Sequence, residues 1–423
     1  IDVIEEENRV VVEGAFVKSI DKNGKLTAFI ERVLRTGNVM LTFNLSDETS
    51  GLYVRMRFEN LEECLQFKKK IKPGMQLRIM GNVAPDRFLF DEMVISPQGI
   101  IAVPKKERMD NAEVKRVELH CHTKMSKMDG VTPMEDLVET AIKWGHKALA
   151  ITDHGVVQAF PFCFDVAEKA DIKLIFGMEG YLMNDDGHDI DLEPTDTIKK
   201  SRIKKVKNNH IIILAKNETG LRNLYKLVTI SHLRYLHKRP MLPREVIEEY
   251  REGLILGSAC EAGELYRAIL AGRPDEELEK IASFYDYLEI QPRCNNRFML
   301  RKGMVNSEED LLNFNRKVVE IGRRMGKPVA ATCDAHYLNE EDYIYRNIIM
   351  AAHGFKELDE EPSLYLKTTD EMLAEFAYLG EKEAERVVID DPQAIADMID
   401  DDVRPISDEK CPPQIEGSEE RLR

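Results

Sequence analysis

The fold is decided by the stretch Arg116-Val-Glu-Leu-His-Cys-His-Thr-Lys-Met-Ser-Lys-Met-Asp-Gly130. Its extended start, Val117–Leu119, predicts the end of a short strand, and His120 and His122 follow directly. Residues two apart on a strand point to the same face, so the two imidazoles are candidates for holding one metal ion. Asp129 lies on the loop beyond them. A lone His-x-His pair also occurs on ordinary surface strands, so the interpretation depends on the rest of the chain.

Length and composition indicate a globular protein of two or three domains. The chain has 423 residues, 43% hydrophobic and 32% charged, and no apolar run long enough to span a bilayer. The start at Ile1 without a methionine or signal peptide suggests part of a longer protein. Seven cysteines without CxxC spacing favour a reducing, cytoplasmic location. The net charge of −16 disfavours a protein that coats duplex DNA.

Residues 8–100 show the short alternating patterns of strands. Asn23-Gly24 is a strong hairpin signal, and a helical pattern at 61–71 ends at Pro73-Gly74. Strands are predicted at 10–12, 15–17, 26–33, 39–45, 52–58, 76–83 and 88–95. A run of strands, one helix and two more strands predicts a small OB-fold β-barrel in residues 1–108, with an unrelated β-barrel as the alternative.

From residue 109 onward, predicted strands and helices alternate. Thr132 resembles an N-cap with Pro133 at the first helical position. Repeated βα units predict an α/β fold with a parallel sheet or barrel in residues 109–360, interrupted by a polar loop at 184–209. Residues 361–423 are predicted to form a helical extension and linker. Strands are predicted at 117–119, 148–151, 174–178, 210–215, 254–257, 287–290 and 329–331, and helices at 134–144, 161–170, 221–231, 243–250, 264–270 and 308–325.

Side chains of the metal-ligating types gather at the ends of these strands. In such folds the functional groups sit at one rim, where the strands end. Histidine with carboxylate suits zinc, manganese or iron. Any one of these residues could be a core histidine or a helix cap, but their repetition at strand ends favours a metal site. The residues are Asp153, His154, Glu179, His210, Cys260, Asp334 and His336.

Five sequence blocks resemble those of the PHP domain, and more closely the PHP domain of PolC-type DNA polymerase III alpha subunits. The preceding OB-like barrel also resembles the PolC arrangement. The resemblance covers nearly the whole chain and implies a distorted (β/α)7 barrel with a trinuclear metal site, in a parent nucleotidyltransferase of DNA replication. The blocks are Val-Glu-Leu-His-Cys-His at 117–122, Ile-Thr-Asp-His-Gly at 151–155, Phe-Gly-Met-Glu-Gly at 176–180, Gly-Ser-Ala-Cys at 257–260 and Cys-Asp-Ala-His-Tyr at 333–337.

The resemblance also implies how nine ligands divide among up to three ions, zinc or manganese with iron as a further option. The second ion would share Glu179 with the first and also bind His210 and Cys260. Cysteine there favours a softer ion such as zinc. The first ion would bind His120, His122, Glu179 and Asp334, and the third Asp129, His154 and His336.

The chain departs from the PolC pattern in two ways. A proofreading exonuclease usually lies between the strands that carry Glu179 and His210, and here only the 184–209 loop stands there. The exonuclease is either removed from this chain or naturally absent. The polymerase palm, fingers and thumb are also missing, so the chain is not expected to polymerise DNA by itself.

Two functions remain open for such an OB–PHP module. In one, a metal-bound hydroxide cleaves phosphoesters or pyrophosphate. In the other, the metals only brace a scaffold, and the barrel, with Lys68, Lys69 and Lys70, weakly binds single-stranded or template DNA. The expected partners are the remaining polymerase core and replisome proteins, without a membrane. A free histidinol phosphatase is disfavoured by the OB barrel.

Five further histidines match none of the blocks. They are interpreted as ordinary helix, loop or core residues: His146, His188, His232, His237 and His353.

Overall fold

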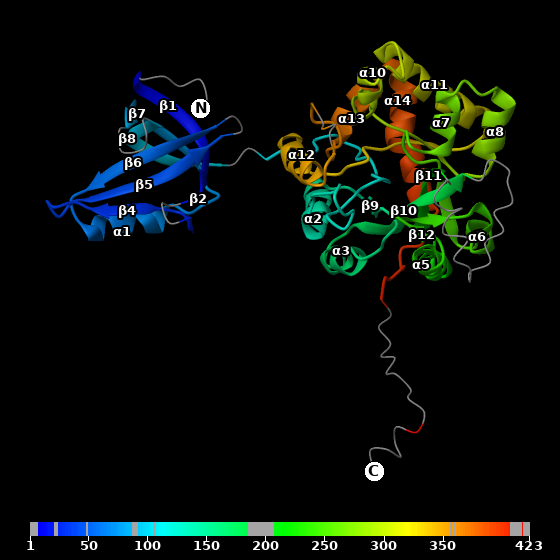
Figure 1. Cartoon of the computed structure of the whole chain (residues 1–423), viewed down its shortest axis with the longest axis horizontal. Helices are drawn as coiled ribbons and strands as arrows, with labels where there is room; N and C mark the ends of the chain where they lie inside the picture. The colour runs from blue at the N-terminus through cyan, green and yellow to red at the C-terminus, as the bar shows by residue number, and fades with distance from the viewer. Residues whose placement is uncertain are drawn as a thin grey trace. The chain divides into compact units, whose positions relative to one another are not determined.

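The computed structural model describes residues 7–20, 24–47, 50–86, 92–104, 107–184, 207–355, 358, 360–406 and 417. The chain divides into two compact units, Ile1–Arg108 and Met109–Arg423 (Figure 1).

The first unit is a β-barrel. Strand β1 pairs antiparallel with both β5 and β7, β5 pairs with β6 and β7 with β8, while β6 and β8 run parallel. The strands therefore close in the order β1-β5-β6-β8-β7, with α1 between β6 and β7 in sequence, which is the OB-fold arrangement. The elements are β1 (Glu7–Val17), β2 (Ser19–Ile20), β3 (Leu26–Thr27), β4 (Ile30–Val33), β5 (Val39–Ser46), β6 (Gly51–Phe58), α1 (Leu61–Lys70), β7 (Gln76–Asp86) and β8 (Glu92–Val103).

Alternation along β5 shows how the sequence builds this barrel. Val39, Leu41, Phe43 and Leu45 are buried, whereas the residues between them face outward or lie under neighbouring side chains. The hairpin predicted around Asn23-Gly24 is present, because Ser19 pairs with Thr27 and Ile20 with Leu26, although Asn23 itself lies outside the described residues. The two short strands predicted at 10–12 and 15–17 are one continuous strand, β1.

The second unit is built on a ring of paired segments. Strands β9 and β10 are parallel, β11 runs antiparallel to both β10 and β14, and β15 and β16 are parallel. Single bridges join β14 to β15 through Gly257 and Tyr287 and join Cys121 to Ala335 and Glu118 to Leu149, which closes the ring. The ring is the expected α/β barrel, and antiparallel β11 distorts it.

Helices surround this ring (Figure 1). The strands are β9 (Ala148–Ile151), β10 (Lys173–Asn184), β11 (Lys207–Ala215), β12 (Leu236–His237), β13 (Arg239–Leu242), β14 (Leu254–Gly257), β15 (Leu288–Ile290) and β16 (Val329–Ala331). The α-helices are α2 (Met134–Trp144), α3 (Phe160–Ala167), α5 (Glu218–Leu233), α6 (Arg244–Glu249), α7 (Glu264–Leu270), α8 (Asp275–Ser283), α9 (Arg293–Asn296), α10 (Phe298–Arg301), α11 (Glu308–Met325), α12 (Tyr343–Ala352), α13 (Thr369–Phe376), α14 (Glu381–Glu385) and α15 (Asp391–Asp397). Short 3-10 turns are η2 (Glu340–Asp342) and η3 (Ala377–Leu379), and η4 (Arg386–Asp390) is a π-helical turn.

The barrel core explains why these segments form strands and helices. Every residue of β9, β14, β15 and β16 is buried, as expected for barrel strands covered on both faces. Helix α11 begins at a capping box of Ser307 and Asp310 and ends at Gly326 in the left-handed conformation, which gives it the predicted bounds. The segment predicted as a helical extension packs on the same core through residues of α13 and η4, among them Met372 and Val387.

Two local predictions are wrong, and some helices were missed. Val117–Leu119 is not a regular strand. The backbone N–H of His120 donates to Oε1 of Glu118, so it is not available to the carbonyl oxygen of a neighbouring strand. Thr132 is not the N-cap of α2, since Pro133 occupies that position without a side-chain cap and the Thr132 hydroxyl turns toward the carbonyl oxygen of His336. Helices α8 and α12 were not predicted.

None of the described helices is both long and apolar enough to cross a membrane.

Candidate metal centre

The predicted ligands lie along one rim of the barrel, although the strands that carry them do not all run in the same direction. His154 follows β9, Cys260 follows β14 and Asp334 follows β16, so parallel strands deliver them at their carboxyl ends. Glu179 lies inside β10, where the strand leaves β9 and begins to pair with β11. Because β11 is antiparallel, its early residue His210 reaches the same rim.

The first group of side chains surrounds a single point. The Nε2 atoms of His120 and His122 lie 3.1 Å apart, and Oδ1 of Asp334 lies 3.2 Å from each of them. The carboxylate of Glu179 completes the group, with Oε1 3.5 Å from His120 Nε2 and Oε2 3.6 Å from His122 Nε2. All four side chains are buried.

The second group shares Glu179. Its Oε1 atom lies 2.5 Å from Nδ1 of His210 and 3.5 Å from Sγ of Cys260, and Cys260 Sγ lies 3.4 Å from His210 Nδ1. An imidazole nitrogen, a thiol sulfur and a carboxylate oxygen thus lie close together at one place on the rim.

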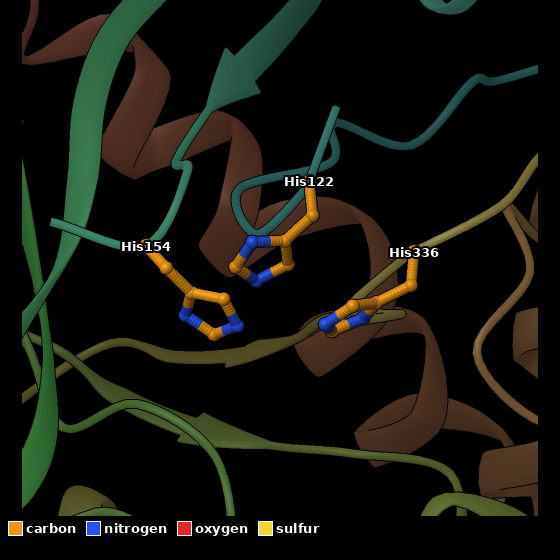
Figure 2. Close-up of side chains that lie close together, drawn as sticks. All are labelled: His122, His154 and His336. Carbon is orange, nitrogen blue, oxygen red and sulfur yellow. The ribbon is translucent and has the colours of Figure 1, made fainter. Parts of the chain in front are cut away.

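The third group lies toward solvent. Oδ2 of Asp129 is 3.3 Å from Nε2 of His154 and 3.6 Å from Nε2 of His336. Figure 2 shows the rings of His122, His154 and His336 pointing toward one another from three separate segments. Ligand atoms of these three histidines lie within 4.8 Å of one another. All nine predicted residues therefore lie together at one rim. The ligand atoms also converge across the predicted division, since His154 lies with Glu179 and His210, so the division into three ions and the role of the residues as ligands stay predictions.

The donors fit metal ions better than they fit one another. Oδ1 of Asp334 lies 3.2 Å from Nε2 of His122, and Oε2 of Glu179 lies 2.6 Å from Nδ1 of His154, but none of the three buried atoms Asp334 Oδ1, Glu179 Oε2 and His154 Nδ1 has a partner with hydrogen-bond geometry. Buried polar atoms are normally satisfied, so lone pairs that converge without bonding indicate a site for cations. Asp334 also holds a left-handed backbone with φ of 53°, a strained conformation typical of functional positions.

Outer side chains orient the histidines. Nδ1 of His120 lies 2.6 Å from Oε1 of Glu289, which turns Nε2 toward the centre. Nδ1 of His122 lies 2.8 Å from Oγ of Ser126, and that hydroxyl donates to Asp153 at 2.7 Å. Metal-binding histidines are commonly held by such partners on the opposite ring nitrogen. Asp153 therefore supports the site from outside the nine predicted ligands.

Charges within the site shift the pKa values of its groups. Burial lowers the pKa of His154, but the carboxylates of Glu179 and Asp129 outweigh it and raise the value to about 10. Burial and the rings of His336 and His154 lower the pKa of His122 to about 3. Burial opposes ionisation of Glu179, yet the surrounding histidines hold its pKa well below the ordinary range. Histidine protons thus balance the carboxylates, and a metal ion that binds must displace them.

The centre opens into a cavity of about 430 Å³. Arg346 of α12 lines it and holds Asp129, with Nε 2.9 Å and Nη2 2.5 Å from Oδ1, which leaves Oδ2 facing the histidines. Glu261 also lines it and forms a group with Cys260 and Asp334. Sequence reasoning missed Arg346, Glu261 and Glu289. Of these, Glu289 could have been identified from the sequence, because it is an acidic residue on an otherwise apolar strand.

The remaining histidines lie outside this centre. His146 is buried, with Nε2 2.9 Å from Oδ2 of Asp110, and His232 Nδ1 lies 2.9 Å from the carbonyl oxygen of Val228. His237 and His353 lie in β12 and at the end of α12. His188, like most of the predicted 184–209 loop, lies outside the described residues.

Comparisons with known proteins show which proteins the chain resembles. Residues 118–293 match the family model of the PHP domain. Over 92% of its length the chain is 36% identical to DNA polymerase III PolC-type from Clostridium perfringens, and over its whole length it is 31% identical to the protein of that name from Caldanaerobacter subterraneus subsp. tengcongensis. The chain carries a PHP domain and is a homologue of PolC-type DNA polymerase III.

This PHP-containing chain spans about two fifths of the length of those relatives, 39% and 42%. The alignment with the C. perfringens protein runs over 574 positions, more than the 423 residues of this chain, so that relative has internal residues without a counterpart here. That this difference is the exonuclease stays a prediction.

Two solved structures also resemble parts of the chain. One is a proposed metal-dependent phosphoesterase from Bifidobacterium adolescentis, with a TM-score of 0.33 and 16% identity over 52% of this chain and 87% of that one. The other is the single-stranded DNA binding protein from Thermus aquaticus, with a TM-score of 0.18 and 14% identity over 24% of this chain and 43% of that one.

Proposed function

We propose that the chain is the OB–PHP module of a PolC-type replicative polymerase and that its PHP domain is a metal-dependent phosphoesterase or pyrophosphatase. The observation that carries the proposal is the meeting of nine ligand-type side chains at one rim, with Glu179 in contact with His120, His122, His154 and His210. Up to three ions are expected. Imidazole with carboxylate suits zinc, manganese or iron, and Cys260 favours zinc in the second group.

The residues of the site have separate roles in this proposed reaction. When bound, the ions act as Lewis acids that stabilise charge developing on phosphoryl oxygens. Glu179 lies between the groups, with Oε1 near His120 and His210, and Glu289 and Ser126 keep the rings of His120 and His122 in position. Arg346 fixes Asp129 at the mouth of the cavity, where a substrate phosphate enters.

Metal content and turnover measured together test this function. We expect elemental analysis of the purified chain, loaded with zinc or manganese, to give up to three ions per chain, and we expect metal-dependent hydrolysis of p-nitrophenyl phosphate. A chain that takes up no metal rejects the site. A chain with full metal content and no turnover of phosphoester or pyrophosphate supports the alternative, a catalytically silent scaffold braced by its metals.

A second function, binding of single-stranded or template DNA, is favoured by the outer face of the barrel. The cross-strand register places Arg32, Met40 and Arg57 in one row, and Tyr53 lies further along the same face of β6. Arg32 and Arg57 are exposed. Arginine and aromatic side chains on a sheet are the combination that holds single strands through phosphate contact and stacking.

The charge distribution permits this binding, although the whole chain is acidic. Residues 1–108 hold 16 acidic and 17 basic side chains, so the whole net charge of −16 arises from the second unit. Of the three predicted lysines, Lys68 is paired with Glu31, whereas Lys69 and Lys70 are exposed. We therefore assign the sheet face as the main contact and expect weak, salt-sensitive affinity. The remaining polymerase core and replisome proteins are the proposed protein partners.

A further inference from the structure

The β12–β13 hairpin borders the metal centre. Strand β13 pairs in parallel with β10, the strand of Glu179, through Tyr181 with Met241 and Leu182 with Leu242. A Cβ atom placed on Gly155, directly after His154, would lie 2.6 Å from Cγ of Pro240 in this hairpin. The hairpin therefore packs directly against the turn that follows His154.

The hairpin carries two adjacent cations into the cavity. Lys238 forms its tip, with a left-handed backbone at φ of 60°, and Arg239 follows. The guanidinium carbon of Arg239 lies 4.9 Å from the ring centroid of Tyr181, and that ring in turn contacts the rings of His154 and His210, with centroids 6.0 and 5.3 Å away. Stacking on a buried ring limits the positions of the guanidinium, which lowers the entropy cost of binding an anion.

Two further cations, Lys127 and Arg346, line the same cavity, and Arg346 differs from the rest. Arg346 is engaged by Asp129, but Arg239, Lys238 and Lys127 form no ion pair with the residues that the structure describes. All three are exposed and line the same cavity as the ligand groups. Three cations without carboxylate partners beside an acidic metal site indicate a place for a further anionic group.

We propose that Arg239, with Lys238 and Lys127, forms an anion subsite that holds a second phosphate of the substrate. The inference rests on the proposed phosphoesterase function and narrows its substrate class: the preferred substrate carries a phosphate beyond the one being cleaved. That phosphate belongs to either a phosphoanhydride or a nucleotide with phosphates on both sides of its sugar. The planar fork of arginine suits bidentate phosphate binding, and the two lysines add point charges.

Calorimetric binding to the full, metal-loaded chain tests the subsite. The ligands are inorganic phosphate, methylenediphosphonate as an uncleavable phosphoanhydride, and thymidine 3′,5′-bisphosphate. We expect Arg239→Ala to weaken at least one of the two-phosphate ligands by about tenfold or more while phosphate itself changes little. The ligand affected identifies the source of the second phosphate. Arg239→Lys should retain part of the affinity, and Arg222→Ala, an exposed arginine on α5, should change nothing.

The outcomes separate this inference from the function on which it rests. If the parent binds metal and phosphate but Arg239→Ala leaves both two-phosphate affinities unchanged, the subsite is rejected and the phosphoesterase stands. If the metal-loaded parent binds none of the three ligands, both are rejected. Metal content and melting temperature of each variant, measured alongside, show that Arg239→Ala is folded and loaded.

Discussion

The Oε1 atom of Glu179 in β10 lies 2.5 Å from Nδ1 of His210, which belongs to the adjacent antiparallel strand β11. The second oxygen of the same carboxylate lies 2.6 Å from Nδ1 of His154. One side chain thus contacts the second and third groups of ligands and also faces His120 and His122. A carboxylate between two cations screens their mutual repulsion and sets their spacing, so its loss should affect more than one ion.

Replacing Glu179 should therefore empty more of the centre than replacing a histidine at its edge. Glu179→Ala should lose more bound metal than His336→Ala and abolish any phosphoesterase activity. The barrel core is apolar and should persist with reduced stability. Metal stoichiometry and turnover of both variants beside the parent measure this. Full metal content in Glu179→Ala would show that Glu179 does not bridge two ions.

Removing metal should also destabilise the parent. An ion that binds only the folded chain stabilises it by mass action, about 2.7 kcal/mol at one hundred times the dissociation constant. A chelator should therefore lower the melting temperature, and Glu179→Ala, already depleted of metal, should respond less. Equal shifts in parent and variant would indicate that the chelator acts elsewhere.

Glu289 should matter as a positioning residue. Its Oε1 atom contacts Nδ1 of His120 at 2.6 Å and accepts a hydrogen bond from Thr332 at 2.8 Å. Removing such a partner typically weakens metal affinity by about 10–100-fold. Glu289→Ala should show this loss for zinc, and Glu289→Gln, which keeps an acceptor oxygen, should recover part of it. The exposed Glu218→Ala on α5 serves as the matched control. An unchanged zinc affinity in Glu289→Ala contradicts the positioning role.

Periodic and capped segments were predictable from the sequence, and long-range pairing was not. Helix α11 and strands β9, β14 and β16 have the predicted bounds, because caps and apolar runs mark them locally. Strand β10 extends beyond the predicted end to Asn184, because antiparallel β11 and short β13 pair with its second half. No local sequence pattern predicts that pairing.

The same distinction holds at the metal centre. His120, His122 and His154 could be found because they stand where predicted strands end. Arg346 belongs to α12, whose sequence gives no sign that it faces Asp129 across more than two hundred residues. Glu118 supports two ligand segments by accepting the N–H groups of His120 and Cys333, a role that only the folded chain reveals.

Asp110 should stabilise the second unit in a pH-dependent way. Its Oδ2 atom accepts hydrogen bonds from the backbone N–H and hydroxyl of Thr369 and contacts His146 Nε2, all within 2.9 Å. Burial raises the pKa of Asp110, but the bonds from His146 and Thr369 outweigh it and hold the pKa below its ordinary value of 3.8. A depressed folded pKa means that the ionised carboxylate stabilises the fold above the unfolded pKa and that this contribution is lost as the pH falls through the folded pKa.

Asp110→Asn should therefore lower the free energy of unfolding by about 1–3 kcal/mol at pH 7, and the difference from the parent should shrink as the pH falls below 4. Urea unfolding followed by the fluorescence of Trp144, the single tryptophan, measures this, since its ring lies 5.6 Å from that of His146. A difference that stays constant from pH 7 to pH 3 would mean that the charge of Asp110 contributes nothing.

The last prediction concerns the outer face of the barrel. Arg32 and Arg57 flank Met40 in one cross-strand row, whereas Arg55 in the next row is paired with Asp86 and is less available to phosphate. Because counter-ion release dominates such binding, the double variant Arg32→Ala/Arg57→Ala should weaken single-stranded oligonucleotide binding at low salt and reduce the dependence of affinity on salt concentration. Tyr53→Ala should weaken binding with little change in that dependence, because stacking involves no counter-ion. Fluorescence anisotropy at several salt concentrations measures both effects. Lys69→Ala/Lys70→Ala, which removes the same charge from α1, is the matched control, and a larger loss there than in the arginine variant would move the binding face from the sheet to the helix.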